Sequence, residues 1–286
     1  MSINPVLKNE MKLMGRSRQM VIIVTAFNLI MTAAILLIFD SINMMSRTSG
    51  GSPWMNVNLM FTVIITLQIC MLTLFVPPIA GGSIAGEFER QTMDILLSSR
   101  MNAKNIIWGK LLSSVSLALL LMVSCLPVDM MMMTYGGLTL PMMAGPLLFS
   151  AFFAFFAGCI GIFWSCHLRR TTGATIATYG MILILTVGIL TLELVTRLLF
   201  GEIAGIRFIV YILCYLQLLN PAVTFSAIVM PIFSGSDIIR SLSEGLYVPL
   251  FITENWILLS VCAQIIFSVI LIIFSVKRLD PIKKRR

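Results

Sequence analysis

The residues of this chain best suited to bind a metal are its thiols, its thioethers and its single imidazole. Cys159, Cys166 and His167 lie close together at the end of one apolar segment, and zinc is commonly bound by thiolate and imidazole. No fourth ligand lies nearby, so we interpret all three as packing residues. Four consecutive thioethers could bind Cu(I); they belong to Met130, Met131, Met132 and Met133. Methionine more often forms adaptable apolar surface, so we expect this run to pack or to contact an apolar substrate, and we expect no metal site.

Carboxylates and histidine, the usual acids and bases of enzymes, are sparse. The 286 residues include 12 acidic residues and one histidine, and none of the carboxylates falls deep within an apolar segment. This pattern argues against an intramembrane protease or metalloenzyme, and we expect no catalytic residue. Asp129 and Glu193 fall near the ends of apolar segments, where we expect solvation by water rather than a proton relay.

Six long apolar segments must position any functional residue. About 20 helical residues cross a hydrocarbon core of about 30 Å. The segments that reach this length are Met20–Phe39, Val57–Ala80, Ile106–Leu126 with Lys110 at its edge, Met142–Trp164, Gly173–Leu192 and Trp256–Val276. Charged residues make up 11% of the chain, against about 25% in soluble domains. We predict an all-α integral membrane protein with six transmembrane helices, folded as one domain over residues 1–286.

Basic residues indicate how these helices are oriented. In a six-span arrangement, sixteen of the 20 lysines and arginines fall on one side of the membrane. Only Arg47, Arg197, Arg207 and Arg240 fall on the other. Because basic residues accumulate in cytoplasmic loops, we predict that both termini are cytoplasmic. This distribution explains the net charge of +8 without nucleic-acid binding.

Two further segments are apolar but do not fit a simple span. Residues 1–19 place apolar and basic side chains on opposite helical faces, which predicts an amphipathic helix on the membrane surface. Residues 201–233 are interrupted by Asn220 and Pro221, which leaves two apolar pieces that are each too short to cross. We predict a re-entrant hairpin on the outer side; whether this segment crosses fully stays open.

The polar segment between the second and third spans carries both signs of charge. Glu87 and Arg90 are three residues apart, and Arg90 and Asp94 are four apart, a spacing that predicts ion pairs along a short helix. A compact charged helix is suited to docking against another protein. On these residues alone, a solvated loop with local ion pairs is equally consistent.

The order of these elements resembles the type-2 permease family of ATP-binding-cassette transporters. The resemblance covers nearly the whole chain and is most specific over residues 85–112. Within it stand Ala85-Gly86-Glu87-Phe88-Glu89-Arg90-Gln91-Thr92, then Asp94-Ile95-Leu96-Leu97-Ser98 and Trp108-Gly109-Lys110-Leu111-Leu112. The family often has glycine where this chain has Gln91, and helix propensity predicts a straighter helix here.

The resemblance implies a role for each of these segments. Residues 83–100 would be the coupling helix that docks into an ATP-binding subunit. The docking residues would be Glu87, Phe88, Glu89, Arg90, Gln91, Thr92 and Asp94. Asn220 and Pro221 would gate the outer exit. The chain would pair with a second permease chain, as homodimer or heterodimer, and with two ATP-binding subunits that carry ATP and magnesium, this chain holding no cofactor.

No phosphate-binding Gly-x-x-x-x-Gly-Lys-Ser/Thr motif occurs in the chain, so the ATPase must be a separate chain. The resemblance implies an exporter in a plasma membrane, with a bacterial one as the best guess, and leaves the cargo open. An ion-coupled secondary transporter and a non-transporting membrane-assembly subunit remain as alternatives. The absence of buried carboxylates and of an evident internal repeat argues against the first of these.

Overall fold

The computed structural model describes residue 12 and residues 17–49, 57–93, 102–136, 139–200, 204–233, 239 and 249–284. These residues form helices and contain no strand. Along the chain the helices are α2 (Arg18–Ser49), α3 (Val57–Glu89), α5 (Ala103–Gly136), α6 (Leu140–His167), α7 (Thr171–Leu183), the π-helix η2 (Ile184–Gly188), α8 (Ile189–Phe200), α9 (Ala204–Leu216), the 3₁₀-helix η3 (Gln217–Leu219), α10 (Pro221–Phe233), α12 (Leu250–Glu254) and α13 (Trp256–Lys284).

The six predicted spans are confirmed. Within the described ranges, six helical segments are long and apolar enough to cross a membrane: Met20–Ser41, Asn58–Glu89, Ala103–Pro127, Leu140–His167, Thr171–Leu199 and Trp256–Leu279. Each is longer than the charge-free segment that predicts it, because helices continue into polar sequence wherever backbone hydrogen bonds can still form. The chain is an all-α integral membrane protein.

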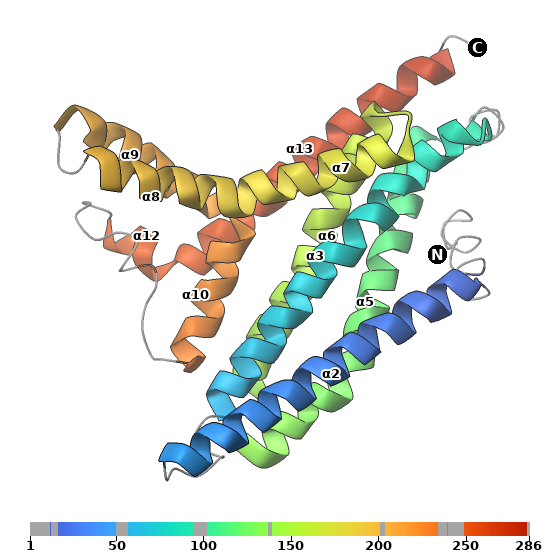
Figure 1. Cartoon of the computed structure of the whole chain (residues 1–286). Coiled ribbons are helices and arrows are strands. Elements are labelled where there is room, and N and C mark those ends of the chain that lie inside the picture. Colours follow the sequence, from blue (N-terminus) through green and yellow to red (C-terminus); the bar gives the residue numbers. More distant parts are fainter. Residues whose placement is uncertain are drawn as a thin grey trace.

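The centre of the bundle is formed by α3 and α6, which pack along each other (Figure 1). Helices α5, α7 and α13 pack around this pair, whereas α2 lies at the side of α3 and α5. The core consists of fully buried apolar side chains such as Ile64 and Leu72 of α3 and Phe156 of α6. Most of the side-chain surface of α2 remains exposed in the single chain.

Small residues bring α3 and α6 into direct backbone contact. A Cβ atom added to Gly161 would lie 2.5 Å from the Cβ of Ala80, so only glycine fits at this crossing. One turn further along α6, the Ser165 hydroxyl oxygen accepts hydrogen bonds from the backbone N–H groups of Ile84 (3.0 Å) and Ala85 (2.8 Å). This contact fixes the last turns of α3 against α6.

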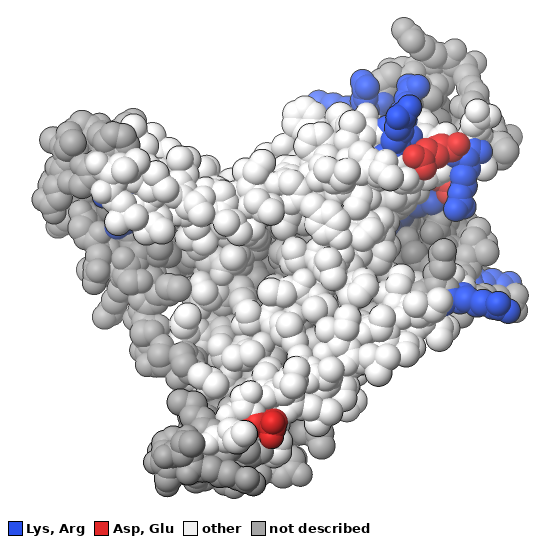
Figure 2. Space-filling model, in the orientation of Figure 1, with Lys and Arg blue, Asp and Glu red and all other residues white. Residues whose placement is uncertain are grey.

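Basic side chains gather at one end of the bundle, as the sequence predicts (Figure 2). We call it the basic end; it comprises the start of α2, the end of α3, the start of α5, the turn Leu168–Arg170 and the end of α13. Of the basic side chains that the structure describes away from it, Arg197 pairs with Glu193. The described segments whose basic residues the charge count assigns to one side of the membrane therefore do lie together.

The segment predicted as a hairpin is broken at Asn220. Residues 209–219 and 221–232 meet at an angle of 78°, and α9 and α10 contain 13 residues each, or about 20 Å of helix. Each arm is thus too short to cross a bilayer alone. Whether the pair re-enters on one side stays a prediction, as does the surface helix over residues 1–19, most of which lies outside the described residues.

Candidate functional site

The end of α3 is closed by a defined cap. The N–H of Gln91 donates to the carbonyl of Phe88 (3.2 Å), and the N–H of Thr92 donates to the carbonyl of Glu87 (3.0 Å). These two bonds form a Schellman motif, which places residue 91 in the left-handed region, and Gln91 has φ 57°. The expectation of a straight helix through Gln91 is therefore wrong, because capping bonds outweigh helix propensity. Glycine favours this conformation, which accounts for its frequent use at this position in the family.

Glu87 faces the protein rather than the solvent. Its Oε1 atom lies 2.9 Å from the Nζ atom of Lys110 on α5, and its Oε2 atom accepts a hydrogen bond from the Thr92 hydroxyl. The lysine side chain is only 5% exposed and that of Glu87 29%. The predicted three-residue ion pair from Glu87 to Arg90 is replaced by this contact between α3 and α5.

Glu89 connects α3 to the start of α7. Its Oε1 atom accepts a hydrogen bond from the Thr171 N–H and its Oε2 atom one from the Thr171 hydroxyl, both at 2.9 Å. A carboxylate is favoured here because the first N–H groups of a helix carry partial positive charge. Between the two glutamates, the Phe88 ring lies 5.7 Å from the Arg169 guanidinium carbon, a cation–π distance.

These contacts form what we call the helix-end cluster: Glu87, Glu89, Thr92, Lys110 and Thr171. It joins α3 to α5 and α7 at the basic end. Among the predicted docking residues, Glu89, Arg90 and Gln91 are exposed and Phe88 is half-buried. Asp94 lies outside the described residues. In the sequence, Lys110 is simply a charge at the edge of a span. Its ion pair with Glu87 is visible only in the structure.

A second polar cluster surrounds the break at Asn220. The Asn220 Oδ1 atom accepts hydrogen bonds from the N–H groups of Ala222 (2.9 Å) and Val223 (3.4 Å), so it caps α10, with Pro221 at the first helical position. Its Nδ2 atom donates to the Thr186 carbonyl in the π-helix, at 2.9 Å. Asn220 thus joins the broken segment to the fifth span.

Charged residues extend this cluster into α8. The Asn220 amide also donates to the Oε1 of Gln217 (2.8 Å), whose own amide donates to Glu193 (2.9 Å). Glu193 pairs with Arg197 at 2.7 Å and is 2% exposed. Solvation of Glu193 by water is therefore a wrong expectation, since η3 folds back onto α8 and supplies its partner. Asp129 is likewise buried, at 1% exposure.

Helix α13 completes the cluster from the other side. Ser260 donates to the carbonyl of Leu218 (2.7 Å) and shares a hydrogen bond with Thr224, to which Gln264 also donates (2.9 Å). We call the whole set the bend network: Thr186, Glu193, Arg197, Gln217, Asn220, Thr224, Ser260 and Gln264. It satisfies backbone groups that the break leaves open, as non-helical backbone at membrane depth requires. The sequence signal is the spacing of four between Ser260 and Gln264 in an apolar helix.

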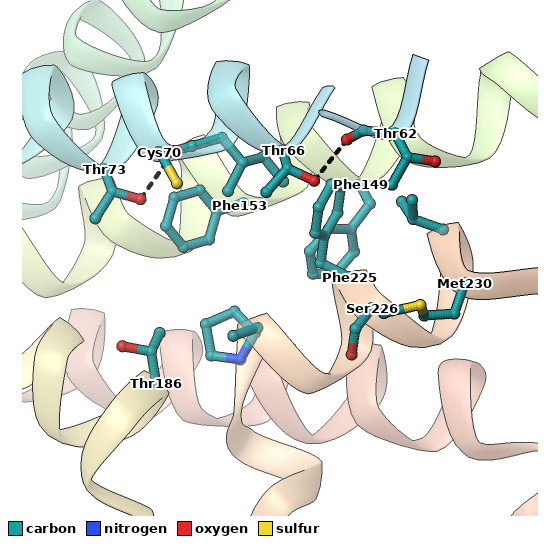
Figure 3. Close-up of a pocket in the computed structure, with 14 residues that line it drawn as sticks. Thr62, Thr66, Cys70, Thr73, Phe149, Phe153, Thr186, Phe225, Ser226 and Met230 are labelled. Atoms are coloured by element: carbon teal, nitrogen blue, oxygen red, sulfur yellow. Dashed lines mark hydrogen bonds between the residues drawn. The ribbon is translucent and has the colours of Figure 1, made fainter. Parts of the chain in front are cut away.

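A cavity of about 480 Å³ lies between α3, α6, η2 and α10. Figure 3 shows α3 side chains across from Thr186, and the rings of Phe149 and Phe225 near one end of the cavity. Of the described residues, neither the predicted docking residues nor Met130 line this cavity. Met130 is exposed on α5, and the side chains of Met131, Met132 and Met133 lie outside the described residues.

Residues 4–280 match the family described as ABC-2 family transporter protein. The chain belongs to this family. The match spans nearly the whole sequence, including both polar clusters, and confirms the resemblance drawn from residues 85–112. No curated protein matches the chain.

Membership makes this ABC-2 chain the permease component of an ATP-binding-cassette transporter, a multi-pass membrane protein that works with ATP-binding subunits. Its family assigns no catalytic chemistry to the membrane component. The arrangement of the helix-end cluster suits mechanical connection, because hydrogen bonds and an ion pair link three spans at one end. The bend network likewise links the fifth span, the broken segment and α13 around the break at Asn220.

Proposed function

We propose that this ABC-2 permease forms half of an ATP-driven exporter. It pairs with a second permease chain and receives two cytoplasmic ATP-binding subunits at the basic end, where both termini lie. ATP and magnesium bind to those subunits, and this chain holds no cofactor. The membrane in this proposal is a bacterial plasma membrane, and the charge distribution of the sequence supports cytoplasmic termini.

The observation that carries the proposal is the helix-end cluster. Arg90 and Gln91 are exposed beside the α3 cap, while Glu87 and Glu89 bind Lys110 and Thr171 of two other spans. A subunit that moves Arg90 would therefore move α3, α5 and α7 together. In this proposal Arg90 and Gln91 provide docking and the two glutamates provide transmission, while Phe88, Thr92 and Asp94 complete the docking segment.

The outer end would respond through the fifth span. Thr171 at the start of α7 bonds Glu89, and the π-helix further along the same span bonds Asn220 through the Thr186 carbonyl. Movement of this span would shift the break at Asn220 and Pro221, which we propose as the outer gate.

Two variants separate docking from transmission. Arg90→Glu should lose the co-purifying ATP-binding subunit, whereas Lys104→Glu, a matched reversal on an exposed lysine at the same end, should keep it. Glu89→Ala should keep the bound subunit but lose ATP-driven transport in reconstituted vesicles, because the bonds to Thr171 are gone. Equal behaviour of the Arg90 and Lys104 variants would overturn the docking assignment.

The class of transporter needs its own measurement. Vesicles that contain the permease and its ATP-binding subunit should move cargo when ATP is supplied and no ion gradient exists. Cargo movement that requires a proton or sodium gradient and does not depend on ATP would favour a secondary transporter. A stable complex that moves nothing with either energy source would favour an assembly role.

A further inference from the structure

The cavity between α3, α6, η2 and α10 has the dimensions of a small-molecule site. Its volume of about 480 Å³ falls within the roughly 300–1,000 Å³ of typical ligand pockets. It lies in the half of the bundle away from the basic end, because the α3 residues that line it, Thr62 to Thr73, follow soon after the helix begins at Val57.

We infer that this cavity binds an uncharged amphipathic molecule that presents a hydrogen-bond donor on an alkyl or ring body. The role of that molecule as cargo rests on the proposed function; its binding does not. Two properties of the cavity wall select this class: the wall carries no charge, and four of its five hydroxyl groups already donate to backbone carbonyls and so remain as acceptors.

The wall excludes charged ligands. None of the 14 lining residues is acidic or basic, so an anion or cation that entered would lose water without gaining a partner. The largest surfaces are aromatic: Phe149 and Phe225 stack with ring centroids 6.1 Å apart, and Phe153 lies one helical turn along α6. An alkyl chain or a ring is therefore the body that fits this wall.

Four of the five hydroxyl groups in the cavity lining have already used their protons. Each donates to a backbone carbonyl of its own helix: Thr66 to Thr62 at 2.6 Å, Thr73 to Ile69 at 2.9 Å, Thr186 to Ile182 at 2.8 Å and Ser226 to Val223 at 2.8 Å. Figure 3 shows the first of these bonds as a dashed line, together with the Thr73 bond. A hydroxyl that donates once still accepts through its lone pairs. These four hydroxyls therefore offer acceptors, and a ligand that matches them must donate. Thr62 also lines the cavity, but its hydroxyl oxygen is itself buried and has no partner among the described residues.

Cys70 provides a built-in reporter of occupancy. It lines the cavity and is exposed. Among the six cysteines, Cys262 is also exposed and the other four are buried. A Cys262→Ser variant therefore leaves Cys70 as the accessible thiol. Occupancy of the cavity should slow alkylation of Cys70 by a small apolar maleimide in lipid nanodiscs.

Three probes of equal chain length test the chemistry. 1-Dodecanol donates a hydrogen bond, dodecyl methyl ether only accepts, and dodecane-1-sulfonate is a permanent anion. In the Cys262→Ser background, dodecanol should slow Cys70 alkylation most strongly. The sulfonate should need at least roughly tenfold higher concentration for the same effect, because its charge would be buried unpaired. Equal protection by all three probes, or by none, would overturn the inference.

Variants place the effect in the cavity. Thr66→Val with Thr73→Val keeps the shape of the wall but removes two of the four acceptors, so the preference for dodecanol over the ether should shrink. Ala222→Phe should fill the cavity and remove protection, whereas Ala144→Phe, on an exposed alanine outside the cavity, should preserve it. If Ala222→Phe fails to fold, the threonine pair still decides the outcome. An alcohol preference that the threonine changes leave undiminished would contradict the acceptor assignment.

The binding test and the transport test fail independently. Alkylation is measured without nucleotide and without the ATP-binding subunit, so protection by dodecanol would stand even if ATP-driven transport were absent. If transport occurs and Cys70 is never protected, the cavity assignment fails while the exporter proposal stands. If both hold, competition between dodecanol and the cargo would identify the cavity as the cargo site.

Discussion

The ion pair between Glu87 and Lys110 should respond unequally to loss of its two partners. Lys110 is 5% exposed on its side chain and Glu87 29%, so Glu87→Met leaves a buried ammonium without its carboxylate. Loss of one partner from a buried pair costs about 3–5 kcal/mol, and we expect about 3 kcal/mol here. Lys110→Met leaves a carboxylate that reaches solvent and keeps the Thr92 hydroxyl, so we expect about 1 kcal/mol.

The double variant Glu87→Met with Lys110→Met supplies the decisive comparison. Replacing both partners by apolar side chains removes the charge instead of stranding it, so the double variant should unfold within about 1 kcal/mol of the original chain. The free energy of unfolding is measured in mixed micelles with rising dodecyl sulfate, followed by the fluorescence of the four tryptophans.

Lys104→Met is the matched control, since this lysine is exposed at the same end, and it should change stability by no more than about 0.5 kcal/mol. Two results would refute the reasoning. Lys110→Met could cost as much as Glu87→Met, which would mean that burial does not decide the asymmetry. Alternatively, the double variant could cost the sum of the singles, which would mean that the two side chains do not interact.

Three further substitutions test separate contacts by thermal unfolding. Gln91→Gly should stabilise by about 1 kcal/mol, because glycine accepts the left-handed conformation at φ 57° without strain; destabilisation would contradict the cap. Gly161→Ala should cost about 1–3 kcal/mol, since its Cβ would meet that of Ala80 at 2.5 Å, whereas Gly180→Ala, with open space around it, should not. Gln68 is fully buried and its amide finds no partner in the described part of the chain. Gln68→Met should therefore stabilise by about 1–3 kcal/mol, and a loss would show that the amide is satisfied.

The spans were predictable because their signal is local. Twenty apolar residues in succession leave few alternatives to a transmembrane helix, and each helix extends beyond its predicted segment at one end or both. The break at Asn220 was predictable for the same reason, because a cap residue followed by proline starts a helix at that point. In each case the information lies within a few consecutive residues.

The polar clusters were not predictable, because their partners are distant in sequence. Glu87 and Lys110 are 23 residues apart, and Glu193 and Gln217 are 24 apart. Short-range spacing suggested a pair between Glu87 and Arg90, and the position of Glu193 near a span end suggested solvation. Both expectations considered only sequence neighbours, whereas the cost of burying a charge makes the folded chain bring in partners from other helices.

Gln91 shows a different limit of sequence reasoning. Helix propensity ranks glutamine well above glycine, yet at a C-terminal cap the required conformation reverses that preference. The capping bonds to Glu87 and Phe88 decide the conformation, and Gln91 adopts it despite the backbone strain of a positive φ. A family preference for glycine at one position is therefore informative about backbone geometry even where the chain departs from it.

Both polar clusters depend on the same span. At one end, Thr171 of α7 holds Glu89; at the other, the Thr186 carbonyl and Glu193 bind Asn220 and Gln217. The π-helix Ile184–Gly188 contains Thr186 and so belongs to the second of these clusters. Such a segment often marks a functional position because it disturbs the regular ladder of hydrogen bonds. Here it presents a carbonyl that Asn220 binds. The span Thr171–Leu199 is thus the structural element through which a displacement of the α3 end would reach the break at Asn220.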